Sequence, residues 1–329
     1  MGSCSAKNHK LANKPISIIM ETDIGNDVDD ALAMDLLYKY LDQDAIKLLA
    51  ININKEGAAP SEYVDILNTW YGYPHIPIGI IANGANCEND AVNYAAVVAN
   101  ETDSQGHPLF KRSHSDIFPD AVDVYRKTLS RQKDSSVTIV SVGFSTNLVR
   151  LLASKPDKYS KLDGKELVAK KVKSLVVMAG CFDRPNFYEY NVVKDIPAAK
   201  TIFEQWPTEL VTSPFEVGAA ILYPATSIEN DFSWAVPAHP VVEAYKAYKP
   251  MPYDRPTWDP TAVLYAVGNK GLFTISPAGK ISVTDKGETV FVADPSSNRR
   301  YLSVTSVQAD SIRTYFIKTV TSVPSKYSK

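Results

Sequence analysis

Short apolar segments rich in β-branched residues alternate with longer amphipathic segments along most of the chain. Strands are predicted at 16–20, 46–53, 76–81, 137–142, 174–179 and 208–213. Helices are predicted between them, at about 30–42, 60–72, 89–99, 119–132, 145–154 and 196–205. Several strands are apolar on both faces, which is typical of a parallel sheet covered by helices on each side. The pattern predicts an α/β fold with a doubly wound, mostly parallel sheet.

The rest of the chain divides into segments of different character. Residues 155–173 carry many lysines and are predicted to be a solvated connection, and 226–258, rich in Pro and aromatic residues, a loop-and-helix insertion. A helix is predicted at 259–267. From 271, alternating apolar and polar residues between turn signals predict a small β-rich extension ending in a helix near 307–320. We therefore expect a leader at 1–14, a main domain at 15–270 and an extension at 271–329 packed on that domain.

Composition excludes several classes of function. The 329 residues are 45% hydrophobic, enough for a large core, and the formal net charge is -2. Nucleic acid is therefore not expected as the main partner, because neutralising phosphates requires a basic surface. The three cysteines are far apart and suggest neither a disulfide framework nor a zinc site. No run approaches the roughly 18 apolar residues of a membrane span.

The N-terminal segment "MGSCSAKNHKLANKP" is polar and lacks the apolar stretch of a signal peptide. It is interpreted as an ordinary flexible leader. "SCS" followed by a polar tether is also similar to the mature end of a bacterial lipoprotein. The compartment stays open between bacterial cytoplasm and periplasm.

An acidic cluster follows the first predicted strand: Glu21, Asp23, Asp27, Asp29 and Asp30 lie within ten residues. In a doubly wound sheet, the first βα turn is a usual anchoring point for ligands. Acidic residues also stabilise helix starts by about 0.3–1 kcal/mol each, which accounts for one or two of them. Five close carboxylates repel strongly, so a cation is expected, and oxygen ligands favour calcium or magnesium over zinc.

The segment "DIGNDVDDALAM" resembles the N-terminal signature of the nucleoside hydrolases, which bind calcium and cleave the N-glycosidic bond of ribonucleosides. Three further segments are similar to family motifs in the same order: 139–152, 176–200 and 255–267. The resemblance therefore extends over about 250 residues.

The resemblance implies a role for each matching residue. Asp23 would ligate calcium and act as general base, Asp30 would bind the metal through both oxygens, and Asp29 would hold a ribose hydroxyl. The Val142 carbonyl and Asp259 would complete the metal ligands.

The same comparison implies further contacts to the sugar. Glu189 and Asn191 would bind ribose, and Asn186 is a weaker candidate for the amide that reaches the 5'-hydroxyl. Asn54 occupies the place of another polar site residue, with Asn52 as a close competitor.

The chain departs from the family pattern in the first turn. Glu21 replaces an Asp, and the turn is longer between Gly25 and the Asp pair than in the common form. Asp27 is therefore an alternative to Asp29 at the ribose, and Asn26 is a candidate to touch the sugar or the attacking water.

The residue expected to assist the leaving base also differs from the family pattern. Many family members carry a His before the last metal-binding Asp, whereas this chain has Trp258. This resembles purine-preferring members, in which an aromatic side chain stacks on the base, although a Trp before a helix also packs in a core. None of the five His lies in a matched motif, and His239 is interpreted as a lone surface residue. Cys181 is interpreted as a small buried residue, and the pair Arg299–Arg300 as part of a solvated turn.

The combined prediction is a calcium-dependent nucleoside N-ribohydrolase that gives ribose and free base, with a preference for purines. The alternatives are a hydrolase of another N-ribosyl compound and a non-catalytic, calcium-dependent ribose-binding module. A phosphatase with an Asp-x-Asp nucleophile is disfavoured, because Glu21 stands two positions before Asp23. The resemblance is also compatible with a homodimer or homotetramer.

Overall fold

The computed structural model describes residues 14–84, 92–115 and 117–328. The predicted leader, except Lys14, lies outside these residues, as do Cys4 and Cys87. Ten described strands form one sheet in the order β11-β10-β12-β6-β5-β4-β1-β2-β3, with β9 paired to β12. The strands are β1 (Ile16–Thr22), β2 (Ile46–Ile53), β3 (Ile78–Gly79), β4 (Val137–Ser141), β5 (Val172–Met178), β6 (Glu209–Ser213), β9 (Thr274–Ile275), β10 (Gly279–Val283), β11 (Thr289–Ala293) and β12 (Arg299–Ser303).

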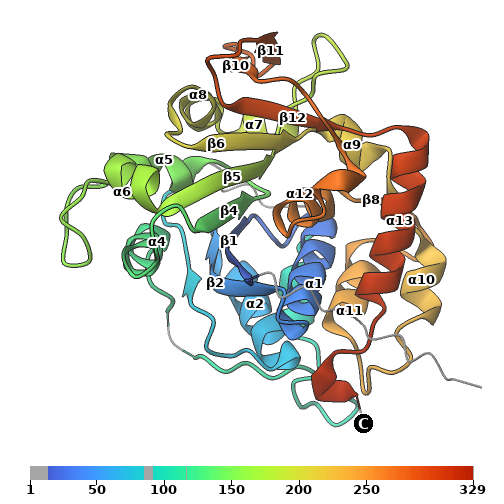
Figure 1. The fold of residues 1–329 in the computed structure, drawn as a ribbon. Coiled ribbons are helices and arrows are strands. Elements are labelled where there is room, and N and C mark those ends of the chain that lie inside the picture. Colours follow the sequence, from blue (N-terminus) through green and yellow to red (C-terminus); the bar gives the residue numbers. More distant parts are fainter. Residues whose placement is uncertain (1–13, 85–91, 116, 329) are drawn as a thin grey trace, which may run out of the picture.

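The central strands β3, β2, β1, β4, β5 and β6 are all parallel, which confirms the predicted fold class. Helices cover both faces (Figure 1). They are α1 (Asp29–Asp42), α2 (Ala58–Tyr71), α3 (Tyr94–Ala99), α4 (Ala121–Ser130), α5 (Thr146–Ala153), α6 (Gly164–Lys171), α7 (Tyr190–Lys194), α8 (Ile196–Gln205), α9 (Phe215–Ala219), α10 (Ala225–Asn230), α11 (Pro240–Tyr248), α12 (Trp258–Ala266) and α13 (Ser306–Val320).

Two hydrophobic cores lie on opposite faces of the sheet. One joins α1, α2, α11, α12 and α13, and the other joins α4, α5, α6 and α8. Neighbouring residues of β1 alternate between them: Ile18 and Met20 belong to the first core and Ile19 to the second. This is why the central strands are apolar at successive positions. No described helix combines the length and apolar character needed to cross a membrane.

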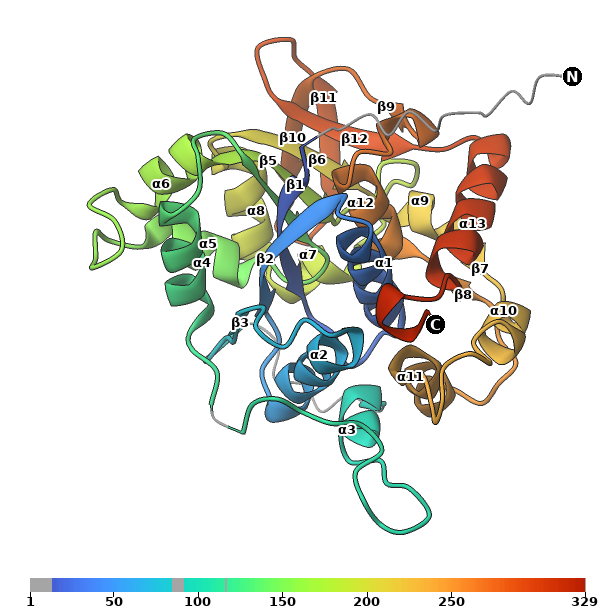
Figure 2. The same cartoon turned by 60° about the horizontal axis from the view of Figure 1, so that its bottom comes forward.

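The C-terminal part continues the main sheet. β12 pairs in parallel with β6, and β10 pairs antiparallel with β12 and β11. The final helix α13 packs against α1 in the first core (Figure 2). A separate antiparallel pair, β7 (Leu222–Tyr223) and β8 (Arg255–Pro256), lies beside α9 and α12.

The structure corrects two predictions about charged segments. The solvated connection predicted at 155–173 contains α6, because Asp163 and Glu166 form a capping box and Leu167 and Val168 are buried. The pair Arg299–Arg300 is not a solvated turn but part of β12.

Arg299 is buried and donates hydrogen bonds to the carbonyls of Phe203, Trp206 and Thr208, around the end of α8. Its charge therefore satisfies backbone acceptors that the helix leaves free at its C-terminus.

Candidate functional site

The acidic cluster lies in the turn between β1 and α1. Gly25 has φ +133°, a conformation that side chains rarely adopt, and it reverses the chain after Asp23. Asp29 and Asp30 are both in the first turn of α1, near the positive end of its dipole. The Thr22 hydroxyl donates a hydrogen bond to Asp30, which fixes that carboxylate against the end of β1.

These residues open onto a cavity of about 310 Å³ at the carboxyl ends of β1, β4 and β5. Its lining residues come from seven separate segments of the chain. They are Asp23, Asn26, Asp27, Asp29, Asp30, Val142, Met178, Glu189, Tyr190, Asn191, Phe215, Tyr248, Trp258 and Asp259. We call this the acidic cavity. Its position is where a doubly wound sheet usually binds its ligand.

Burial raises the pKa of the carboxyl groups in the acidic cavity. The pKa of Asp23 rises to about 7, chiefly by desolvation, which outweighs the attraction of Lys55. The pKa values of Asp29, Asp30 and Asp259 lie well above their usual range, through desolvation and then repulsion by neighbouring aspartates. The site therefore holds more negative charge than the protein by itself neutralises, which favours a bound cation.

Glu189 and Asn191 are held by the backbone around the end of β5. Glu189 caps α7, accepting from the amides of Asn191 and Val192, and it also accepts from the Gly180 amide at 3.0 Å. Burial raises its pKa to about 7. The Asn191 side-chain amide donates to the Val142 carbonyl at 3.2 Å and the Met178 carbonyl at 3.1 Å. These bonds orient both side chains at the cavity wall.

Asn54 and Asn186 do not line the acidic cavity. Asn54 is fully buried beneath it and donates to Phe144 O at 2.8 Å and to Glu21 at 3.3 Å. Its competitor Asn52 is likewise buried away from the cavity wall. Asn186 is exposed, and its backbone amide donates to Glu288 at 2.8 Å.

Glu21, which replaces an Asp of the family pattern, is hydrogen-bonded beneath the first turn. It is fully buried and bonds to the Tyr125 hydroxyl and to Asn54, and burial raises its pKa to about 8. Glu21 therefore lies under the cavity and does not line it.

Aromatic side chains form the opposite wall of the acidic cavity. Trp258 donates its indole N–H to Phe215 O at 3.0 Å, and their ring centroids are 5.4 Å apart. Tyr190 and Tyr248 also line the cavity, whereas Trp234 packs elsewhere against Trp70. The fixed Trp258 ring offers a flat apolar surface beside the carboxylates.

An ion pair that the sequence analysis missed joins Asp27 to Arg255. The Arg255 Nε donates to Asp27 at 3.0 Å, and a second guanidinium nitrogen forms an ion pair with the same carboxylate. The guanidinium also lies 5.1 Å from the Trp258 ring centroid and 4.9 Å from that of Tyr248. The two residues are 228 positions apart, so no local pattern paired them. The position of Arg255 at the start of the fourth motif was the available signal.

His239 is not the surface residue that the sequence analysis described. Its side chain is buried among Trp70, Trp234 and Phe232, and its Nε2 is 3.8 Å from Asp35. Burial lowers its pKa well below the usual value. It does not line the acidic cavity, so it is outside reach of a ligand there.

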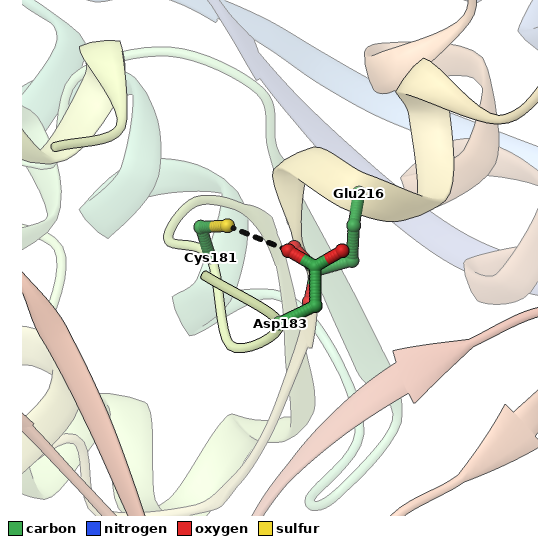
Figure 3. Close-up of side chains that lie close together, drawn as sticks. All are labelled: Cys181, Asp183 and Glu216. Carbon is green, nitrogen blue, oxygen red and sulfur yellow. Dashed lines mark hydrogen bonds between the residues drawn. The ribbon is translucent and has the colours of Figure 1, made fainter. Parts of the chain in front are cut away.

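Cys181 is buried, as predicted, but it has two acidic neighbours. Cys181, Asp183 and Glu216 each have a ligand atom within 4.8 Å of the other two. In the described part of the chain, the acidic cavity supplies no group that meets this criterion. Figure 3 shows the thiol directed toward the two carboxylates, with a 3.2 Å hydrogen bond to Asp183. Burial and these charges raise the pKa of the thiol to about 12. A neutral thiol is a poor metal ligand, so this trio is a weak cation site.

The donors of the acidic cavity fit a hard divalent cation. Asp23, Asp30 and Asp259 are each at most 5% exposed, and together with the Val142 carbonyl they offer oxygen atoms only. Carboxylate and carbonyl oxygens are the ligands that calcium and magnesium prefer. The buried, mutually repelling carboxylates agree with this assignment.

Comparison with known proteins identifies the family. The family model described as "Inosine-uridine preferring nucleoside hydrolase" matches residues 18–314. The chain belongs to this family. This nucleoside hydrolase is therefore an enzyme, a hydrolase acting on N-glycosyl bonds, in a family that is in general metal-dependent.

Solved structures show the same fold. A plant nucleoside hydrolase is 18% identical with a TM-score of 0.69, covering 94% of this chain and 100% of its own. A purine-preferring ribonucleoside hydrolase from Gardnerella vaginalis is 16% identical with a TM-score of 0.67, covering 93% and 99%. An inosine-guanosine nucleoside hydrolase is 18% identical with a TM-score of 0.70, covering 93% and 97%. No curated protein sequence matches the chain significantly.

Proposed function

We propose that this nucleoside hydrolase is calcium-dependent, cleaves ribonucleosides to ribose and free base, and prefers purine nucleosides. The observation that carries the proposal is the acidic cavity itself. Four buried aspartates and the Val142 backbone line it together with Glu189, Asn191 and Trp258. A volume of about 310 Å³ is at the small end of ligand sites, which suits a nucleoside.

Asp23, Asp30, Asp259 and the Val142 carbonyl would hold the cation. Bound calcium would lower the pKa of a water and polarise it for attack. Asp23 would take the proton of that water. A carboxyl group in this buried position is suited to proton transfer near neutral pH, and such general-base catalysis contributes typically 10²–10⁴-fold.

Asp29, Glu189 and Asn191 would hold the ribose hydroxyls. The negative charge of the cavity would stabilise the oxocarbenium-like sugar as the bond to the base breaks. The ion pair with Arg255 occupies the Asp27 carboxylate, which favours Asp29 over Asp27 at the ribose. Asn26, whose side-chain oxygen accepts from Lys55 at 3.1 Å, would contact the sugar or the attacking water.

The base would stack on Trp258, with Tyr248 and Tyr190 beside it. The Phe215 carbonyl and the Arg255 guanidinium fix the indole, so stacking requires little further ordering of that side chain. A purine offers a larger flat surface than a pyrimidine, which is the basis for the purine preference. The relatives named for purine substrates share under 20% identity and support only the fold.

The test is release of free ribose from inosine, guanosine, adenosine, uridine and cytidine, with calcium and after chelation. Asp23→Asn should lower turnover by about 10²–10⁴-fold. Asp163→Asn is the matched control, because Asp163 caps the remote helix α6 and Asn caps equally well. Full turnover in Asp23→Asn would show that Asp23 is not the general base. Turnover that is insensitive to chelation would show that the reaction does not need a bound cation.

Hydrolysis of another N-ribosyl compound is the second candidate. The residues that would hold the sugar match the family better than those that would face the base. The type III effector protein XopQ, solved with adenosine diphosphate ribose, is 17% identical with a TM-score of 0.63. Ribose release from adenosine diphosphate ribose but from no nucleoside would favour this candidate. Nucleoside binding without ribose release would instead indicate a non-catalytic ribose-binding module.

A further inference from the structure

A second, larger cavity of about 550 Å³ lies at the opposite edge of the sheet, where the central parallel strands begin. Its lining includes six cationic side chains: Lys14, Lys47, Arg131, Lys133, Lys173 and Lys270. No carboxylate is among the described residues that line it. We call this the basic cavity. A protein with a net charge of -2 therefore gathers six positive charges at one concave place.

The six cations come from separate parts of the chain and not from one local run. Lys14 precedes β1, Lys47 is in β2, Lys173 is in β5, and Arg131 and Lys133 follow α4. Lys270 begins the short 3-10 helix η1 (Lys270–Leu272) after α12. The sheet register places Lys47 opposite Ser17, and Ser17 opposite Val137. The fold thus brings the cations together, as in a site built from remote segments.

Helix dipoles explain part of this charge. Helices that cross back over a parallel sheet end at this edge, and cations near a helix C-terminus are favourable by about 0.3–1 kcal/mol. Arg131, Lys133 and Lys270 follow helix ends and fit this account. Lys47 and Lys173 lie in strands, and Lys14 precedes β1. Helix dipoles therefore do not explain the positions of these three cations.

Asp134 and Glu209 are acidic residues near the basic cavity, against six cations in its lining. Asp134 is next to Lys133, but it pairs with Lys171 at 2.8 Å. Glu209, at the start of β6, lies opposite Ser174 of the cavity lining, and burial together with the Glu209 charge raises the pKa of Tyr265 at the cavity wall. A concave surface of one sign concentrates the opposite charge from solution. Hydroxyl groups share the lining, and those of Ser17 and Ser135 offer hydrogen-bond donors to an anion. The Ser136 hydroxyl already donates to the Lys133 carbonyl at 2.6 Å, and the Thr138 and Ser174 hydroxyls bond to each other at 3.3 Å.

We propose that the basic cavity binds a small molecule carrying two or more phosphate groups. Several phosphates match six cations better than one does, and phosphate oxygens accept charge-assisted bonds from Lys and Arg. The cavity volume is in the range of small-molecule sites, whereas a nucleic acid backbone requires an extended basic track. The site is separate from the acidic cavity, so the proposal does not depend on the substrate of the enzyme.

The structure also shows how the two cavities are connected. β1 runs from Ser17 in the basic cavity to the turn that carries Asp23 in the acidic cavity. α12 runs from Asp259 in the acidic cavity to Ala266 in the basic cavity (Figure 1). A ligand at one edge therefore contacts the same two elements that position the aspartates at the other.

The test is calorimetric titration of the full chain with inorganic triphosphate, in buffer without divalent cations and at two salt concentrations. Saturable binding of one triphosphate, weakened by salt, is expected. The variant Lys47→Glu with Lys173→Glu should weaken binding at least tenfold. The milder variant Lys47→Gln with Lys173→Gln should lower affinity in the same direction, and it guards against a folding defect. Ribose release, which depends on the other edge, checks that each variant is folded.

The matched control is Lys165→Glu with Lys200→Glu, on exposed positions of α6 and α8 outside the cavity, with the same change in net charge. Unchanged triphosphate binding by this control supports a defined site, and an equal loss overturns it. No saturation up to about 1 mM triphosphate also overturns the proposal. So does binding of a single-stranded oligonucleotide or of anionic lipid vesicles that is tighter than triphosphate binding and lost in the cavity variants.

Discussion

Gly143 follows β4 and lies against the general-base candidate, and substitution by Ala tests that contact directly. A Cβ atom at this position would lie 2.6 Å from the Asp23 Oδ1, 2.8 Å from the Asp23 Cβ and 2.6 Å from the Asn54 Oδ1. Rotating the Asp23 carboxylate relieves the first contact but not the second, because Cβ moves only with the backbone. Gly143→Ala must therefore displace Asp23.

The size of the effect follows from these distances. Restoring a normal separation of about 3.5 Å requires a movement of about 1 Å. Asp23 is 5% exposed and Asn54 is fully buried, so neither has free space. Overpacking of this kind costs about 1–3 kcal/mol of stability. A misplacement of about 1 Å in a catalytic group lowers the rate by about 10²-fold.

The assay is kcat/KM for ribose release from inosine, with Tm measured on the same preparation. Gly143→Ala should lower kcat/KM by about 10²-fold while the protein still unfolds cooperatively. Gly271→Ala is the control, because no heavy atom lies within 4 Å of the Cβ it adds. Normal activity and Tm in Gly143→Ala would show that the turn carrying Asp23 is not held as described.

Three further predictions concern other parts of the molecule. Trp258→Leu should lower kcat/KM for inosine by about tenfold and for uridine by less, and an equal loss on both would argue against stacking on the base. Arg299→Met should lower the free energy of unfolding, measured by chemical denaturation, by about 3 kcal/mol, since three carbonyls lose a donor; Arg299→Lys should lower it by less, because the ammonium keeps the charge but replaces only part of the planar guanidinium's donors. Asp157→Asn should cost at most about 1 kcal/mol at pH 7: Arg126 lowers the pKa of Asp157 to about 2, but solvent screens the exposed carboxylate and Arg126 keeps other partners in the variant. The folded-state pKa is depressed, so this stability is present above pH 4 and is lost as pH falls toward 2. Wild type and variant should converge there, and a constant difference would contradict the ion pair.

Much of the site was predictable because its residues are concentrated in the first turn and in three motifs. Asp23, Asp27, Asp29 and Asp30 follow the first strand, and the carboxyl end of that strand is where a doubly wound sheet binds ligands. All predicted site residues except Asn54 and Asn186 line the acidic cavity. Asn186 was only a weaker candidate, and Asn54 faces Glu21 and Phe144 instead of the cavity.

The errors have a common physical cause. His239 was interpreted as a surface residue because it lies in no matched motif, but Trp70, from a distant segment, and Trp234 pack against its ring. Arg299 was assigned to a solvated turn, but it lies in β12, and carbonyls around the end of α8 accept its hydrogen bonds. A charged or polar side chain is buried when partners are available, and the local sequence does not contain those partners.

The sequence by itself determined the order of the central parallel strands, since apolar periodicity records which faces must be buried. It also determined the chemical character of the acidic turn, since charge is a property of the residues themselves. Only the tertiary structure decided which remote groups meet: Arg255 with Asp27 of the acidic cavity, and six cations around the basic cavity. These contacts depend on the relative positions of the ends of the parallel strands. Those positions follow from the packing of the whole sheet.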